Sequence, residues 1–97
     1  MKEISINSVK KFLNAQKFSQ SNTVVKVYPN VTVLELFGNE IAYLYNDPER
    51  TLEITTTGWY SQTTKERLNA IPNVHIVQAN HILYLNGKKW DGSLTKI

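Results

Sequence analysis

The chain has 97 residues, of which 41% are hydrophobic, 10% aromatic and 20% charged, and it contains no cysteine. This length fits one domain, 1–97, with a modest core, and the composition excludes a disordered chain and a coiled coil. The lack of cysteine excludes disulfides, thiol catalysis and cysteine-based zinc sites. No apolar run is long enough for a membrane helix, so we expect a soluble cytoplasmic protein with no membrane partner.

The formal net charge of +3 is distributed unevenly along the chain. Both ends are basic, over residues 1–20 and 61–97, whereas residues 21–60 carry more acidic than basic side chains. A dedicated nucleic-acid-binding protein usually has a denser basic patch, so the net charge is only a weak indication of such a partner.

An amphipathic helix is predicted at 8–18, because Val9, Phe12 and Leu13 recur there at helical spacing. From residue 23 onward β-branched and aromatic residues dominate, with Gly, Pro, Asn and Asp between short runs. This pattern is typical of consecutive antiparallel strands joined by short turns. The predicted strands are 23–28, 31–37, 40–46 and 51–57.

The Gly38-Asn39 pair predicts a two-residue hairpin turn, because glycine and asparagine tolerate positive φ. Such a turn determines which side chains of the two flanking strands share a face of the sheet. The side chains expected on the core face are Leu34, Leu36, Ile41 and Tyr43. Those expected on the opposite face are Val33, Glu35, Ala42 and Leu44.

A short helix is predicted at 64–70, where Thr63 and Glu66 have the spacing of a capping box. The fold class is therefore α+β, with an N-terminal helix on an antiparallel β-meander, then a short helix and a C-terminal β-hairpin. The hairpin is expected to comprise strands 74–78 and 81–85 around a turn near Ala79-Asn80, a second turn at Asn86-Gly87, and a last strand ending at Trp90.

The sheet face opposite the core is the candidate partner-binding surface. It combines apolar side chains with acidic ones, a mixture that suits a protein partner or the second copy of a homodimer. The candidate residues are Val33, Glu35, Glu40, Ala42 and Leu44.

A nucleic-acid-binding site in the C-terminal half is the alternative. Basic groups beside aromatic rings suit single-stranded nucleic acid, because lysine and arginine attract phosphates and the rings stack on bases. A helix-turn-helix is not expected, because a strand precedes the 64–70 helix where that motif needs another helix. The alternative site comprises Trp59, Tyr60, Lys65, Arg67, Lys88, Lys89 and Trp90.

Catalytic and metal-binding patterns are weak in this sequence. His75 and His81 flank a predicted turn and could face each other across two strands, but no motif supplies a third ligand. Glu35 and Glu40 could be neighbours, but a small meander offers little concavity for a substrate. The four glycines have neither P-loop nor dinucleotide-binding spacing. We therefore expect a protein that is not an enzyme and holds no metal and no cofactor.

Residues 58–92 resemble a pattern in small proteins encoded by bacteriophages and related mobile elements. In that pattern a Gly-aromatic step precedes a Thr-Lys-Glu-Arg-Leu helix, and a strand pair ends in Tyr-Leu-Asn-Gly-Lys before a closing Trp-Asp-Gly. Residues 22–47 show a looser likeness, whereas His81-Ile82-Leu83 replaces an aromatic residue and a glycine that such proteins often have. The matching positions are Gly58-Trp59, Thr64–Leu68, Tyr84–Lys88 and Trp90–Gly92.

The resemblance implies a phage origin. Together with the candidate surface, it leads us to expect a small non-enzymatic accessory protein that binds a host or defence protein. Binding would inhibit or redirect that protein in the cytoplasm of the host cell.

Overall fold

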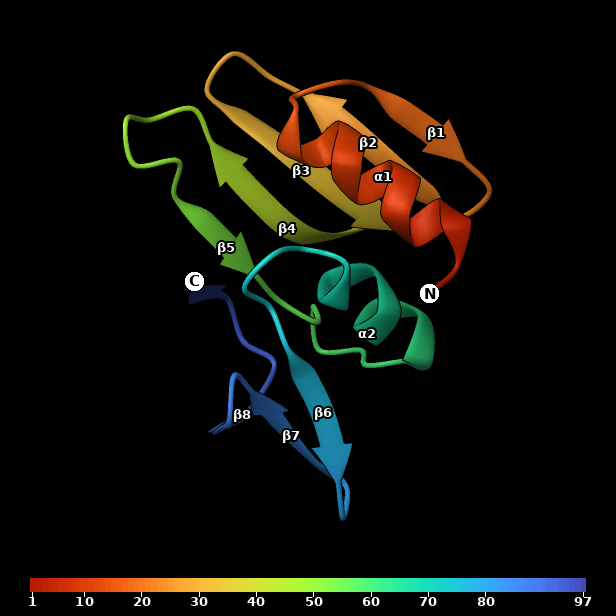
Figure 1. Ribbon diagram of the computed structural model, residues 1–97, viewed down its shortest axis with the longest axis vertical. Coiled ribbons are helices and arrows are strands. Elements are labelled where there is room, and N and C mark those ends of the chain that lie inside the picture. Colours follow the sequence, from red (N-terminus) through yellow and green to blue (C-terminus); the bar gives the residue numbers. More distant parts are fainter.

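The computed structural model describes residues 1–97 and contains two helices and nine strands. The strands form two antiparallel sheets, one of six strands and one of three. Helix α1 lies across one face of the larger sheet, and the smaller sheet extends away from it (Figure 1). The α+β fold class is confirmed, with helix, meander, second helix and C-terminal hairpin in the predicted order. The elements are α1 (Glu3–Leu13), β1 (Phe18–Gln20), β2 (Thr23–Val27), β3 (Val31–Leu36), β4 (Asn39–Tyr45), β5 (Leu52–Ile54), α2 (Gln62–Asn69), β6 (Ile76–Ala79), β7 (Ile82–Leu85), β8 (Lys88–Trp90) and β9 (Thr95–Lys96).

Helix α1 begins at Glu3 and ends at Leu13, so the predicted span of 8–18 was displaced toward the C-terminus. Two serines belong to the buried stripe of this helix, because their side chains are small enough to pack beneath the sheet. The stripe therefore starts a full turn before the apolar residues indicate. Phe18, which was assigned to the helix, begins strand β1, and β1 pairs with β2. The buried stripe consists of Ser5, Ser8, Val9 and Phe12.

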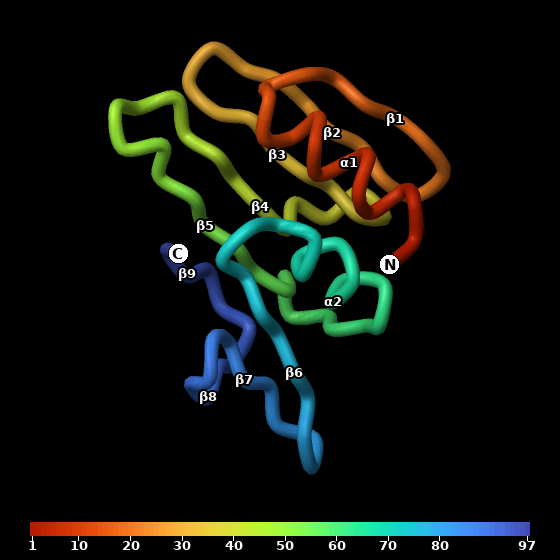
Figure 2. Tube along the Cα trace, viewed as in Figure 1, coloured from red at the N-terminus to blue at the C-terminus, as the bar shows by residue number.

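The six-stranded sheet has the order β1-β2-β3-β4-β5-β9. Its first five strands follow one another along the chain, whereas β9 returns from the C-terminus to pair with β5 (Figure 2). Strand β9 was not predicted, because a two-residue strand held by a distant partner leaves no local pattern. The face that α1 covers holds much of the core, including Val25, Leu34, Ala42, Leu44 and Ile54.

The predicted register of the β3–β4 hairpin was wrong. The turn residues are Phe37 and Gly38, with φ of 52° and 79°, and both signs are those that a type I′ turn requires. Leu36 therefore pairs with Asn39. Ile41 has no partner residue in β3, because a bulge shifts the register there. The ladder continues with Leu34 opposite Ala42, Val33 opposite Tyr43 and Thr32 opposite Leu44.

This register places Ala42 and Leu44 on the core side, so their assignment to a partner-binding face was wrong. Both side chains are buried in the main hydrophobic cluster. Tyr43, which was expected in the core, lies on the uncovered face instead. The physical reason is that the bulge lets Ile41, Ala42 and Leu44 all leave water, which the simple alternation of an unbulged strand does not allow.

The N-cap of helix α2 lies two residues before the predicted capping box. It is Ser61, whose Oγ accepts the backbone N–H of Thr64 at 3.1 Å. The Thr63–Glu66 box was therefore wrong. The three-stranded sheet is close to its prediction, since Asn86-Gly87 forms the turn between β7 and β8, and Asn80-His81 forms the turn before it. Neither helix is long and apolar enough to cross a membrane.

Candidate functional site

The uncovered face of the six-stranded sheet shields its own apolar side chains. Val33 is only 2% exposed, because it lies in the ladder between Lys26 and Tyr43. Glu35 is 7% exposed and forms an ion pair with Lys26, with 2.9 Å between Lys26 Nζ and Glu35 Oε2. Of the five residues proposed for partner binding, Glu40 alone remains exposed. This face therefore offers a partner little apolar surface.

The tyrosines of this face are held by acidic neighbours. Tyr43 Oη donates to Glu40 Oε1 at 2.9 Å, and the Tyr43 and Tyr45 rings stack with centroids 6.5 Å apart. Burial, and then the bond to Glu40, raise the pKa of Tyr43 to about 12. The hydroxyl therefore stays protonated and bonded at neutral pH, and the face behaves as a closed polar network.

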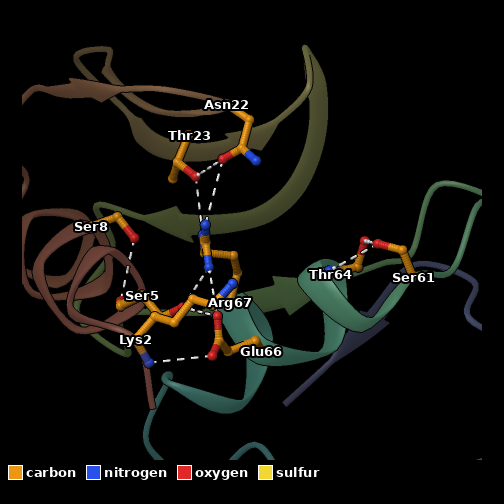
Figure 3. A network of polar contacts seen from close by, with 9 residues as sticks. All are labelled: Lys2, Ser5, Ser8, Asn22, Thr23, Ser61, Thr64, Glu66 and Arg67. Carbon is orange, nitrogen blue, oxygen red and sulfur yellow. Dashed lines mark hydrogen bonds and ion pairs between the residues drawn. The ribbon is translucent and has the colours of Figure 1, made fainter.

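Arg67 was proposed for nucleic-acid binding, but it is buried at the junction of α2, α1 and β2 (Figure 3). Its side chain is 4% exposed. Nε donates to Thr23 Oγ1 at 3.0 Å, and Nη1 donates to Ser5 Oγ at 2.6 Å and to Glu66 Oε2 at 2.9 Å. The guanidinium donates its hydrogen bonds inside the protein and is therefore not accessible to a phosphate.

Glu66 completes this junction. Its carboxylate accepts the Lys2 backbone N–H at 3.2 Å and the Ser5 hydroxyl at 3.0 Å, in addition to the Arg67 guanidinium. Burial raises the pKa of Glu66, but these two hydrogen bonds and the arginine charge outweigh it and hold the pKa below the usual range. Glu66 is therefore a structural link between the N-terminus and α2.

Two other aromatic candidates, Tyr60 and Trp90, are also partly taken up by contacts within the protein. Tyr60 packs half-buried against the core, and its buried hydroxyl has no hydrogen-bond partner in the structure. Burial raises the pKa of that hydroxyl. The Trp90 indole Nε1 donates to Thr95 Oγ1 at 2.8 Å and to the Ser93 carbonyl at 3.2 Å.

The proposed basic residues come from separate elements. Lys88 and Lys89 are exposed on β8 in the smaller sheet. Lys65 lies on α2, in a shallow polar cleft that it shares with Lys2 and Glu66. Hydrogen bonds and packing thus take Arg67 and Tyr60 out of the predicted set and leave Trp59 as its most exposed aromatic side chain.

The two histidines do not face each other, which corrects the expectation of a cross-strand pair. His81 lies in the turn between β6 and β7. His75 lies at the opposite end of β6, where its carbonyl accepts the Asn86 N–H at 2.8 Å. The whole length of β6 therefore separates them.

An exposed aromatic pair, Phe37 and Trp59, stands at one end of the larger sheet. Phe37 is 55% exposed and Trp59 is 52% exposed, and their ring centroids are 5.8 Å apart at an interplanar angle of 53°. We call these two residues the aromatic pair. Phe37 belongs to the β3–β4 turn, and Trp59 to the loop between β5 and α2, so the pair joins segments distant in the chain.

Backbone hydrogen bonds fix both loops that carry the aromatic pair. The Phe37 N–H donates to the Asn22 carbonyl at 2.8 Å, and the Trp59 N–H donates to the Thr56 carbonyl at 3.1 Å. Thr56 is itself anchored, because its N–H donates to the Gly92 carbonyl at 2.9 Å. The rings are thus presented by an ordered backbone and not by free loops.

The segments that carry the aromatic pair, and the strand segment beside them, contain no charged residue, although the exposed Glu40 directly follows the Phe37 turn. Three segments meet at this end of the sheet, since Thr23 pairs with Leu36 and the Thr55 N–H donates to the Ile41 carbonyl. None of them contains Asp, Glu, Lys or Arg. The segments are 18–25, 36–39 and 54–64.

Comparison with known families decides the origin of the chain. The family model described as Kyanoviridae Gp96 protein matches residues 1–95. The chain belongs to this phage protein family. The resemblance drawn from residues 58–92 is thereby confirmed as to phage origin, and the match extends over nearly the whole chain. No curated protein and no solved structure matches the chain.

In this Kyanoviridae Gp96 family member, the place of Phe37 in the turn was not predicted from the sequence. Residues 37 and 38 form a type I′ turn, for which asparagine is preferred at the first position, as Asn86-Gly87 shows in the same chain. An aromatic residue before glycine between two strands was the available indication. It was overlooked because Gly38-Asn39 also fits a hairpin turn and displaces Phe37 into the strand.

Proposed function

We propose that this phage protein is a non-enzymatic accessory protein that binds a host or defence protein through the aromatic pair and thereby modulates it. Modulation is proposed to be inhibition, and the site of action the host cytoplasm. Membership of a phage family supports the biological setting. The exposed pair of Phe37 and Trp59 supports the binding role.

The single observation that carries the proposal is the conformation of Phe37. The left-handed backbone conformation costs a residue other than Gly, Asn or Asp about 1–2 kcal/mol, because its Cβ atom crowds the following carbonyl oxygen. Phe37 accepts this cost at φ 52° and leaves most of its ring in water. Eight other non-glycine residues also have positive φ, but Phe37 alone among them carries a large exposed apolar side chain. Local departures of this kind concentrate at functional sites.

The chemistry of the aromatic pair indicates an apolar pocket on the partner. Tryptophan is enriched among residues that dominate binding energies, and large aromatic rings lose few rotamers on binding. The uncharged segments around the pair add Ser, Thr, Asn and Gln groups that hydrogen-bond at the rim. A partner with an apolar cavity bordered by neutral polar groups therefore fits this end of the sheet.

The test is capture of host proteins on immobilised protein, with a nuclease-treated lysate in parallel. Wild type is expected to retain a partner, and Phe37→Asn and Trp59→Ser are expected to lose it. The matched control is Tyr28→Asn, because Tyr28 is 47% exposed and lies in the β2–β3 connection at the opposite end of the strands. Capture that survives both pair substitutions, or that Tyr28→Asn also abolishes, would remove the aromatic pair from the proposal.

The nuclease arm separates the nucleic-acid alternative from protein binding. Capture that disappears on nuclease treatment would transfer the proposed function to nucleic-acid binding. In that case affinity should fall steeply with salt, and Lys88→Glu combined with Lys89→Glu should weaken it, since these are the exposed basic residues of β8.

A further inference from the structure

The free edge of β6 differs from the other sheet edges of the molecule. Edge strands usually avoid pairing with other chains by being very short or by carrying lysine. Strand β8 carries two lysines, β9 has two residues and includes Lys96, and β1 has three residues and follows Lys17. Strand β6, Ile76–Ala79, has four residues with no charge and no proline.

Asn69 shows which backbone groups of β6 face away from β7. Its Oδ1 accepts the Ile76 N–H at 2.7 Å, and its Nδ2 donates to the Ile76 carbonyl at 3.0 Å. In an antiparallel ladder the N–H and carbonyl of one residue point to the same side, and the next residue's point to the opposite side. Gln78 therefore directs its N–H and carbonyl to the same free edge as Ile76.

The β6–β7 turn leads to the same orientation. A two-residue hairpin loop closes on a hydrogen-bonded pair, which here is Ala79 with Ile82. The backbone N–H and carbonyl groups of Val77 and Ala79 therefore bond to β7, whereas those of Gln78, between them, point away from β7. Asn69 occupies the start of the edge in the way a neighbouring strand would, whereas the Gln78 groups are left to solvent.

We propose that the β6 edge pairs with β6 of a second copy of this chain, in an antiparallel arrangement about a two-fold axis. Each Gln78 N–H donates to the Gln78 carbonyl of the other copy, so the pair is symmetric. Val77 of one copy then lies opposite Ala79 of the other. The two small sheets become one continuous sheet, and the interface is isologous, as in most homodimers.

Charge favours a second copy as the occupant of this edge. A two-fold contact between identical strands brings like residues together, so a charged strand would repel itself. Strands β6 and β7 carry no charged side chain, whereas the chain as a whole has a net charge of +3. The contact thus occurs where the positive charge of the two molecules opposes it least.

Side chains on one face of the small sheet extend the contact. Val77 pairs with Tyr84 and Ala79 pairs with Ile82, so all four lie on the same face, and Val77 is 41% exposed. Pairing across the two-fold axis makes this face continuous between the copies. The small sheet extends away from the six-stranded sheet, which keeps the two larger sheets from obstructing the approach (Figure 1).

Analytical ultracentrifugation of the full chain over a dilution series tests the proposal. Wild type is expected to dimerise, Gln78→Pro to be a folded monomer, and Gln78→Thr to remain dimeric. Proline deletes the outward N–H, which no bond inside the sheet uses, whereas threonine keeps it and favours a strand. A wild type that is monomeric at every concentration, or a dimeric Gln78→Pro, would overturn the proposal. Binding of an unrelated extended peptide to the edge would not rescue it, because the proposed occupant is a second copy of this chain.

Amide hydrogen exchange gives a second measurement, which covers the case in which Gln78→Pro fails to fold. Protection of the Gln78 amide should rise with protein concentration, while the Ala79 amide, bonded within the sheet, should be protected throughout. Val77→Lys adds a charge to an exposed position of the strand and should give a folded monomer. Concentration-independent exchange of Gln78, or a dimeric Val77→Lys, would contradict edge pairing. Phe37→Asn should stay dimeric, so this outcome is independent of the proposed partner-binding function.

Discussion

Phe37 and Arg67 are the two residues whose predicted positions the structure corrects most. Phe37 was expected in a strand and forms a strained turn, while Arg67 was expected at a nucleic-acid surface and is buried. Local pattern does not distinguish an arginine that binds phosphate from one that satisfies buried hydroxyls, because its partners Ser5 and Thr23 are remote in the chain. The burial of Arg67 was therefore beyond sequence analysis, whereas the Phe-Gly turn was within its reach.

Replacing Phe37 by Asn should raise the free energy of unfolding by about 0.5–1.5 kcal/mol. Asparagine tolerates positive φ and relieves strain of about 1–2 kcal/mol, while the lost contact between two half-exposed rings costs about 0.5 kcal/mol. Urea unfolding followed by circular dichroism measures the change. A clear fall in stability would show that Phe37 serves the fold and would argue against a binding role.

Replacing Arg67 by Ala should lower the free energy of unfolding by about 3 kcal/mol, because it leaves two buried hydroxyls without their donor and removes the positive charge beside Glu66. Arg67→Lys should recover only part of this, since one ammonium cannot reproduce the forked guanidinium geometry. Lys65→Ala, two residues away on the same helix, is the matched control and should change stability little. Equal losses in Arg67→Ala and Lys65→Ala would refute the structural role of Arg67.

At the scale of elements, the strands of the meander and the hairpin were predictable, but the register was not. Alternating β-branched residues and turn residues locate β2, β3, β4, β6 and β7. The bulge at Ile41 and the choice between two possible turns depend on which alternative buries more apolar surface. The buried apolar area is a property of the packed sheet, which the local sequence does not show. The observed register buries Ala42 and Leu44 and so removes them from the candidate site.

Leu44→Glu tests the corrected register. The substitution should unfold the protein, because it places an unpaired carboxylate in the core beside the residues that α1 covers. Tyr43→Glu, at the next position on the uncovered face, should leave the protein folded. Circular dichroism of both variants is sufficient, and a folded Leu44→Glu with an unfolded Tyr43→Glu would restore the register that the sequence suggested.

The junction of α1, α2 and β2 should weaken in acid. The folded-state pKa of Glu66 lies below its unfolded value, so its contribution to stability is complete above the unfolded pKa and is lost as pH falls through the folded pKa. The lowered pKa values of Asp47 and Asp91 act in the same direction. Glu66→Gln should therefore be less stable than wild type at neutral pH, and the difference should shrink in acid. A difference that does not change with pH would contradict the assignment.

At the scale of the whole molecule, charge and binding surfaces are separated. The aromatic pair lies among uncharged segments of the larger sheet, and the proposed dimer edge lies in the smaller sheet, where β6 and β7 are uncharged. Composition alone gave a mildly basic chain and left nucleic-acid binding open. The distribution of exposed groups in three dimensions is the basis on which we propose protein contacts instead.

Partner binding through the aromatic pair should change little with ionic strength, because screening acts on charges and neither ring of the pair is charged. Calorimetric titration of the captured partner at low and high salt measures this. A steep loss of affinity with salt is the behaviour of phosphate contacts and would indicate the lysines of β8 instead.

The most direct test of the central claim is to compare partner capture by wild type and Phe37→Asn from the same nuclease-treated host lysate, at equal loading of folded protein. The proposed binding role predicts that Phe37→Asn loses the partner while unfolding at the same or a higher urea concentration than wild type. Undiminished capture by a folded Phe37→Asn protein would contradict it.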